Sequence, residues 1–189
     1  MRRSDGFTLI ELMMVVVVIA ILAGLAVVAY TRSVVKARSA EVPQIFGELK
    51  SREESYKAEF GTYASLCPSA PANVVPSDCA EGDYWPTPLP GKGNQMDATV
   101  MPARWLTLRV SLPRGGLYCQ YEVIAGPAGS NLQISTMGQK LDLFTKGMWQ
   151  FRAWYYLIAQ CDWDGDPAVN ALYWQQDDLT ELGVSDPQR

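Results

Sequence analysis

The sequence contains no histidine among its 189 residues. Histidine is the side chain most often used as a general base, and it is also the commonest zinc ligand. The remaining residues show no spacing typical of a nucleophile and its base. We therefore expect that this chain is not an enzyme and needs no resident cofactor.

An excess of positive charge is also missing. The formal net charge is -4, so the sequence predicts no basic surface for nucleic acid. Hydrophobic residues make up 48% of the chain and charged residues 19%, which excludes a disordered tail. The length suits one ordinary domain with an extension.

The four cysteines form no Cys-x-x-Cys pair, which makes a metal cluster less favoured than two disulfides in an oxidising compartment. Three connectivities are possible, and buried free thiols remain an alternative. We favour Cys67 with Cys79, which closes a short loop, and Cys119 with Cys161, which joins two strands.

Charge is absent from Leu12 to Tyr30, where a helix would cover roughly 28 Å, enough to span a bilayer. The preceding residues 1–6 are short and carry two arginines, as expected of a leader held on the cytoplasmic side. No small-residue cleavage site follows the apolar run, so we expect it to be retained. Arg32, Lys36 and Arg38 follow it, and charge alone leaves the orientation open.

Glu11 lies inside this apolar segment. A charge at the centre of a membrane helix costs about 2.5–3.5 kcal/mol, and such groups are usually functional. The carboxylate therefore needs a partner or a proton, unless it reaches water at the cytoplasmic interface.

The run Gly6-Phe7-Thr8-Leu9-Ile10-Glu11-Leu12-Met13 resembles the processing and assembly motif of bacterial type IV pilins and of the related pseudopilins of type II secretion. The likeness covers about the first thirty residues. It implies that an inner-membrane aspartyl peptidase, the prepilin peptidase, cuts between Gly6 and Phe7 and methylates the new amino group of Phe7. The family often has a proline where this chain has Val28.

Removal of the leader gives Phe7 a positive amino group, with a pKa of about 7.7–8.0 in model peptides. In a filament of bundled apolar helices that charge enters a core without water. Glu11 of a neighbouring subunit could neutralise it, with an attraction of about 4 kcal/mol at contact distance. The pair forms only in one axial register, so Glu11 is predicted to guide assembly.

The helical pattern continues to Phe60, where Gly61 is expected to cap the helix, while Pro43 is expected to bend it near residues 39–41. One face is apolar, interrupted by Ser39 and Glu53, and is predicted to pack on a globular head. It comprises Val35, Val42, Ile45, Phe46, Leu49, Tyr56 and Phe60. The opposite face, predicted to be solvated, carries Arg38, Glu41, Glu48, Lys50, Arg52, Glu54 and Lys57.

The head is predicted to be α+β, with an antiparallel sheet of about four strands on the apolar face of the helix. The expected strands are 105–110, 117–124, 149–160 and 171–175, with a hairpin through 113–116. The whole chain divides into a cleaved leader (1–6), a transmembrane and assembly helix (7–30), an amphipathic helix (31–60) and a globular head (61–189).

Asp162, Asp164 and Asp166 alternate in an acidic turn between the last two predicted strands. Oxygen ligands at this spacing could hold calcium. The same three carboxylates could hold a catalytic metal in a membrane-anchored enzyme. A hairpin loop of turn-forming residues is the commoner explanation.

Aromatic residues gather in the C-terminal part of the chain. Such residues are more often core and cross-strand pairs than a carbohydrate- or surface-binding platform. They are Trp149, Phe151, Trp154, Tyr155, Tyr156, Trp163, Tyr173 and Trp174.

The resemblance implies a structural subunit that sits in the bacterial inner membrane as a single-pass protein and then polymerises. Its expected partners are copies of itself or other pilins, the prepilin peptidase and the inner-membrane assembly machinery. The product would be a pilus on the cell surface, used in adhesion or motility. A pseudopilin in a periplasm-spanning filament for type II secretion or DNA uptake, and an anchored binding module that does not polymerise, are the alternatives.

Overall fold

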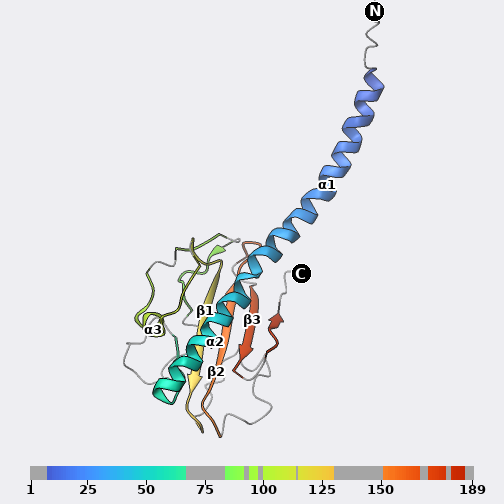
Figure 1. Ribbon diagram of the computed structural model, residues 1–189. Coiled ribbons are helices and arrows are strands. Elements are labelled where there is room, and N and C mark those ends of the chain that lie inside the picture. Colours follow the sequence, from blue (N-terminus) through green and yellow to red (C-terminus); the bar gives the residue numbers. More distant parts are fainter. Residues whose placement is uncertain are drawn as a thin grey trace, which may run out of the picture. The chain divides into compact units, whose positions relative to one another are not determined.

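The computed structural model describes residues 8–66, 84–91, 94–97, 100–113, 115–129, 151–166, 170–177 and 180–185. The chain divides into two compact units, Met1–Arg38 and Ser39–Arg189. The described residues of the first unit form a helix, and those of the second form an α+β head (Figure 1).

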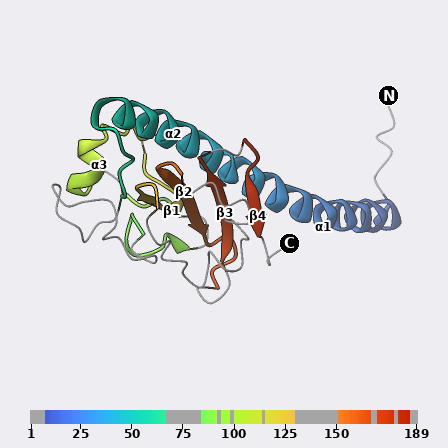
Figure 2. The same ribbon diagram turned by 90° about the horizontal axis from the view of Figure 1, so that it is seen from below.

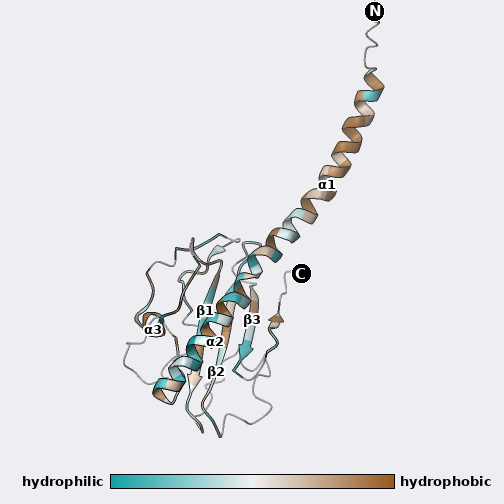
Figure 3. Cartoon of the chain, in the orientation of Figure 1, coloured by the Kyte–Doolittle hydropathy of each residue, from teal (hydrophilic) through white to brown (hydrophobic). Residues whose placement is uncertain are grey.

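Helix α1 spans Leu9–Ser39, and none of its residues is buried. Brown, apolar residues cover most of its length in Figure 3. The helix is long and apolar enough to cross a membrane. The predicted apolar helix is therefore present.

The helical pattern is interrupted at Ala40, and α2 follows over Glu41–Phe60. Pro43 has no backbone N–H, so the carbonyl group of Ser39 loses its i→i−4 donor, which explains why α1 ends there. At the other end Gly61 adopts a φ of 75°, and its N–H donates to the carbonyl oxygen of Lys57 at 2.8 Å. The helix is interrupted where Pro43 was expected to bend it, and the glycine cap is confirmed.

The sheet is antiparallel, with the strands in the order β1-β2-β3-β4. Its strands are β1 (Cys119–Gly126), β2 (Trp154–Cys161), β3 (Ala171–Gln176) and β4 (Gly183–Ser185). The register pairs Cys119 with Cys161 and Cys161 with Ala171, so the acidic turn lies between β2 and β3. The predicted fold class is confirmed.

Both faces of β1 are covered, and all eight of its residues are buried. Helix α2 lies over one face of the sheet (Figure 2) and contributes Val42, Ile45, Phe46 and Leu49 to the core. Residues alternate between the faces of a strand, so Ile124 points away from α2. There it belongs to a second apolar cluster with Trp154, Tyr156 and Ile158. The predicted apolar face of α2 is correct except at its end, where Phe60 is 56% exposed.

The predicted strand 105–110, and with it the hairpin through 113–116, is wrong. Helix α3 occupies Ala103–Thr107, and Pro102 is its N-cap. Trp105 and Leu108 are buried at helical spacing, whereas Leu106 between them is 56% exposed. The fourth strand is instead β4, whose three residues are too few for a sequence pattern to show.

Candidate functional site

Thr8 and Glu11 form a reciprocal cap at the start of α1. The backbone N–H of Thr8 donates to Oε2 of Glu11 at 3.0 Å, and its hydroxyl donates to the same oxygen at 2.8 Å. In return, the N–H of Glu11 donates to the hydroxyl of Thr8 at 3.3 Å. This is a capping box, and its Thr-x-x-Glu signature was readable in the sequence but missed.

The cap determines where the carboxylate of Glu11 lies. It bonds to the first residues of its own helix, where the helix dipole also favours negative charge. Gly6 and Phe7, predicted to carry cleavage and methylation, lie outside the described residues. Thr8 directly follows Phe7, so a new amino group at Phe7 is one residue from an atom that Glu11 binds.

Apart from Glu11, the surface of α1 is apolar along its first twenty residues, including large side chains such as Ile10, Met14 and Leu25, all more than two-thirds exposed. Soluble monomers rarely expose contiguous apolar patches larger than a few hundred Å². This helix therefore needs apolar surroundings, either lipid or other helices.

Residues 1–27 match the family model of the prokaryotic N-terminal methylation motif. The chain carries the class III leader of type IV pilins and pseudopilins. No curated protein and no solved structure matches the chain. The pilin leader implies processing by prepilin peptidase and assembly of the pilin kind, and the apolar helix that follows is consistent with anchoring in the inner membrane.

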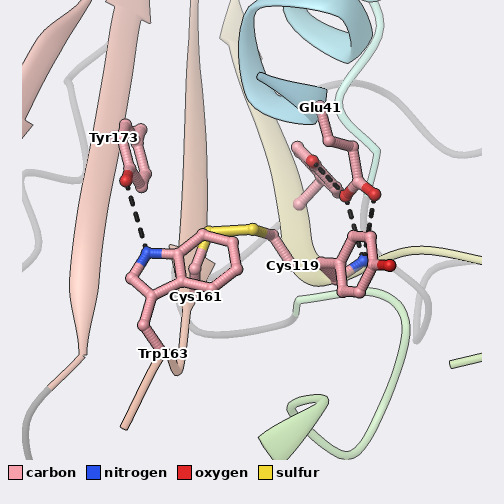
Figure 4. The surroundings of a disulfide bond; sticks show 7 residues. Glu41, Cys119, Cys161, Trp163 and Tyr173 are labelled. Carbon is pink, nitrogen blue, oxygen red and sulfur yellow. Dashed lines mark hydrogen bonds between the residues drawn. A yellow bond between two sulfur atoms is a disulfide. The ribbon is translucent and has the colours of Figure 1, made fainter. Parts of the chain in front are cut away.

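In the head that follows the pilin leader, Cys119 and Cys161 form the predicted disulfide between β1 and β2, with their Cα atoms 4.5 Å apart. Figure 4 shows Glu41 beside it. Both carboxylate oxygens of Glu41 accept the N–H of Tyr118 at 3.1 Å, and one accepts the hydroxyl of Tyr121 at 2.7 Å. Burial raises the pKa of Glu41 against the effect of these bonds. The prediction that Glu41 is solvated is wrong, because its helix position faces β1.

The Cys119–Cys161 disulfide closes a separation of 42 residues. Replacing both cysteines by serine is expected to lower the free energy of unfolding by about 3–4 kcal/mol, because the unfolded chain regains the entropy of an open loop. Thermal unfolding of the full chain in detergent would measure this as a fall of roughly 10 °C. An unchanged melting temperature would contradict it. If the stability of the double variant still falls on addition of reductant, the remaining disulfide joins Cys67 and Cys79, which lie outside the described residues.

The acidic turn is held by bonds within itself. Oδ1 of the buried Asp162 accepts the N–H of Gly165 at 2.6 Å, and Oδ1 of Asp164 accepts the N–H of Asp166 at 2.8 Å. Gly165 has a φ of 93°. In the described part of the chain no group of three or more His, Cys, Asp or Glu side chains is placed to hold a metal ion. Calcium binding therefore stays a prediction.

The C-terminal aromatic residues belong mainly to the core. Trp154, Tyr155, Tyr156, Trp163 and Tyr173 are buried, while Trp174 is partly buried. Trp163 donates from Nε1 to the hydroxyl of Tyr173 at 3.4 Å (Figure 4). Phe151 is 86% exposed, and Trp149 lies outside the described residues. Packing, not a binding platform, explains most of this cluster.

Glu53 is a buried carboxyl group that sequence reasoning treated as a gap in the apolar face. Its exposed fraction is 0%, and its Oε2 accepts the N–H of Ala64 at 2.9 Å. Oε1 has no hydrogen-bond partner among the described residues. Desolvation raises the pKa of Glu53 to about 8, and the neighbouring carboxylate of Glu54 adds to the rise. Glu53 is therefore protonated in the folded head at neutral pH.

Proposed function

We propose that this chain is a structural subunit of a type IV pilus or pilus-like filament, assembled through α1. The apolar surface of α1 carries the proposal, because a helix with no buried residue must find apolar contacts outside its own chain. The leader supplies the matching chemistry, since prepilin peptidase would cut after Gly6 and methylate Phe7.

Glu11 gives the assembly its register. A protonated amino group at Phe7 loses its hydration inside a helix bundle, and a carboxylate at contact distance offsets about 4 kcal/mol of that cost. Before assembly, the capping box keeps Glu11 close to the amino end of its own helix. In the filament the same carboxylate meets the amino group of a neighbour, so only subunits in the correct axial position have both charges paired.

Intact-mass analysis of the mature protein tests the processing. We expect the mass to show loss of Met1–Gly6 and addition of one methyl group. A Gly6→Val variant, expected to keep its leader, is the matched control. A mature chain that retains Met1–Gly6 would refute the proposal, because the buried amino group would never form.

A pseudopilin of a type II secretion or DNA-uptake system is the second candidate, favoured by the same leader. Electron microscopy with immunogold labelling separates the two. Labelled filaments beyond the cell surface support a pilus, whereas filaments confined to the periplasm support a pseudopilin. Monomers at every expression level would instead support an anchored binding module.

A further inference from the structure

Two charges bracket the uncharged part of α1. Glu11 precedes it, and Arg32 is the first charged residue after it, 21 residues further along the chain. At 1.5 Å per residue the two lie roughly 32 Å apart along the helix, which is close to the thickness of about 30 Å of the hydrocarbon core of a bilayer. A helix that crosses the membrane therefore has Glu11 near one boundary of the hydrocarbon and Arg32 near the other.

The residues just before Arg32 suit the edge of the hydrocarbon. The side chain of Tyr30 is 71% exposed, and tyrosine is enriched where lipid tails meet the headgroups. The hydroxyl group of Thr31 donates to the carbonyl oxygen of Val28 at 3.0 Å, so this polar group needs no partner outside its own helix. Arg32 is the first charged side chain after the apolar run, and it must find polar surroundings elsewhere.

The depth of Arg32 separates it from the two cations that follow it. The headgroup layer on each side of the hydrocarbon is about 5–7 Å thick. A hydrocarbon core that begins at Leu9 or at Leu12 takes up about 20 residues of helix and ends one to four residues before Arg32, which places Arg32 in the headgroup layer in both cases. Lys36 and Arg38 follow at roughly 6 and 9 Å further along the helix, beyond this layer.

Arg32 also differs from these cations in its contacts. Its side chain is exposed, and no hydrogen bond or ion pair joins it to another described residue. Lys36 and Arg38 each have an interaction within the chain. No aspartate or glutamate lies between Glu11 and Glu41, so α1 supplies no counter-charge at this depth. An anion from outside the helix is therefore the partner that would stabilise Arg32 beside the low-dielectric hydrocarbon.

We propose that Arg32 binds the phosphate group of a phospholipid, in the leaflet on the side of the head. A guanidinium group presents its N–H groups as a planar fork that fits two oxygens of one phosphate, and the headgroup layer of a phospholipid bilayer contains phosphates at this depth. The bound headgroup fixes how deep α1 sits, and it thereby holds Glu11 near the opposite boundary until the subunit leaves the membrane. The site rests on membrane anchoring, which is part of the proposed function, and not on filament formation.

Solid-state NMR of the full chain in bilayers of phosphatidylethanolamine and phosphatidylglycerol tests the contact directly. With isotope-labelled guanidinium carbons, dephasing by the lipid phosphorus reports an arginine in contact with a phosphate. Arg32→Gln is expected to remove the dephased signal of one arginine. Arg38→Gln is the matched control, because Arg38 lies on the same helix beyond the headgroup layer, and it is expected to leave the dephased signal unchanged.

Native mass spectrometry measures how tightly the headgroup is held. The fraction of chains that retain a phospholipid after release from detergent is expected to fall about five-fold in Arg32→Gln, as for loss of a charge contact of about 1 kcal/mol. The melting temperature is expected to stay that of the wild type, because the exposed Arg32 side chain makes no contact with another described residue.

A phosphate-free galactolipid bilayer separates a lipid headgroup from a free anion. Inorganic phosphate added to this bilayer is not expected to dephase the Arg32 signal. The site would be overturned by dephasing from inorganic phosphate alone, by an Arg32→Gln variant that behaves as the wild type, or by an equal loss in Arg38→Gln. These measurements need no assembly machinery, so a chain that forms no filaments would overturn the proposed filament and leave the lipid site intact.

Discussion

Replacing Glu11 by alanine is expected to stop filament growth while leaving removal of residues 1–6 intact. In the proposed mechanism the peptidase would cut between Gly6 and Phe7, whereas Glu11 would act later, by neutralising the amino group that the cut creates. Loss of about 4 kcal/mol of attraction per subunit corresponds to roughly a thousand-fold weaker association. Electron microscopy of sheared filaments and intact-mass analysis of the membrane fraction would measure the two steps separately.

The capping box makes Glu11→Gln the informative control. A glutamine amide oxygen can still accept from the N–H and hydroxyl of Thr8, so the cap remains while the charge is lost. If the charge guides assembly, Glu11→Gln fails as Glu11→Ala does. If Glu11→Gln assembles normally and Glu11→Ala does not, the cap is what matters, and the pairing with Phe7 is refuted. Thr8→Ala keeps the charge and weakens the cap. It should therefore assemble if the charge guides assembly, and fail to assemble if the cap is what matters.

Replacing Glu53 by glutamine is expected to stabilise the folded chain at pH 8 by about 4 kcal/mol and to change it little near pH 4. The pKa of Glu53 rises from 4.5 to about 8 on folding. Between these values the folded state binds more protons than the unfolded state, so the contribution of Glu53 is complete below pH 4.5 and is lost as the pH rises through 8. Glutamine resembles the protonated acid and does not titrate.

Thermal unfolding of the full chain in detergent, from pH 4 to pH 9, measures this effect. The difference between wild type and Glu53→Gln removes the contribution of other titrating groups, such as Glu41. The matched control is Glu54→Gln, because Glu54 is exposed and accepts the hydroxyl of Tyr63 at 2.9 Å. The Glu54→Gln variant should still lose stability as the pH rises towards 8, as the wild type does. A difference between wild type and Glu53→Gln that does not vary with pH would contradict the burial of a protonated carboxyl group.

Helices α1 and α2 and three of the strands were predictable because local signals decide them. The uncharged run sets α1, Pro43 interrupts the helix, and Gly61 ends it. The strands 117–124, 149–160 and 171–175 correspond to β1, β2 and β3, although two of them begin later than expected. In each case periodicity and turn residues agree with the final packing.

The failures share a physical cause, which is that tertiary contacts decide them. Residues 105–110 alternate in polarity closely enough to suggest a strand, but Trp105 and Leu108 point into the core from a short helix. Glu41 was predicted to be solvated, and Glu53 was predicted to interrupt the apolar face of the helix. Both predictions were made because a helix pattern counts every glutamate as polar. Their hydrogen-bond partners, Tyr118 and Ala64, lie in segments that only the fold brings near.

The bonds of Glu41 also determine how the head would respond to mechanical tension. A pull transmitted along α1 enters the head at the start of α2, where Glu41 is bonded to Tyr118 and Tyr121. One residue beyond Tyr118, the Cys119–Cys161 bond ties β1 covalently to β2. Hydrogen bonds at this point can break and reform under load, whereas the disulfide keeps the first two strands together. In the proposed filament, the head would thus be reinforced at the point where tension along α1 enters it.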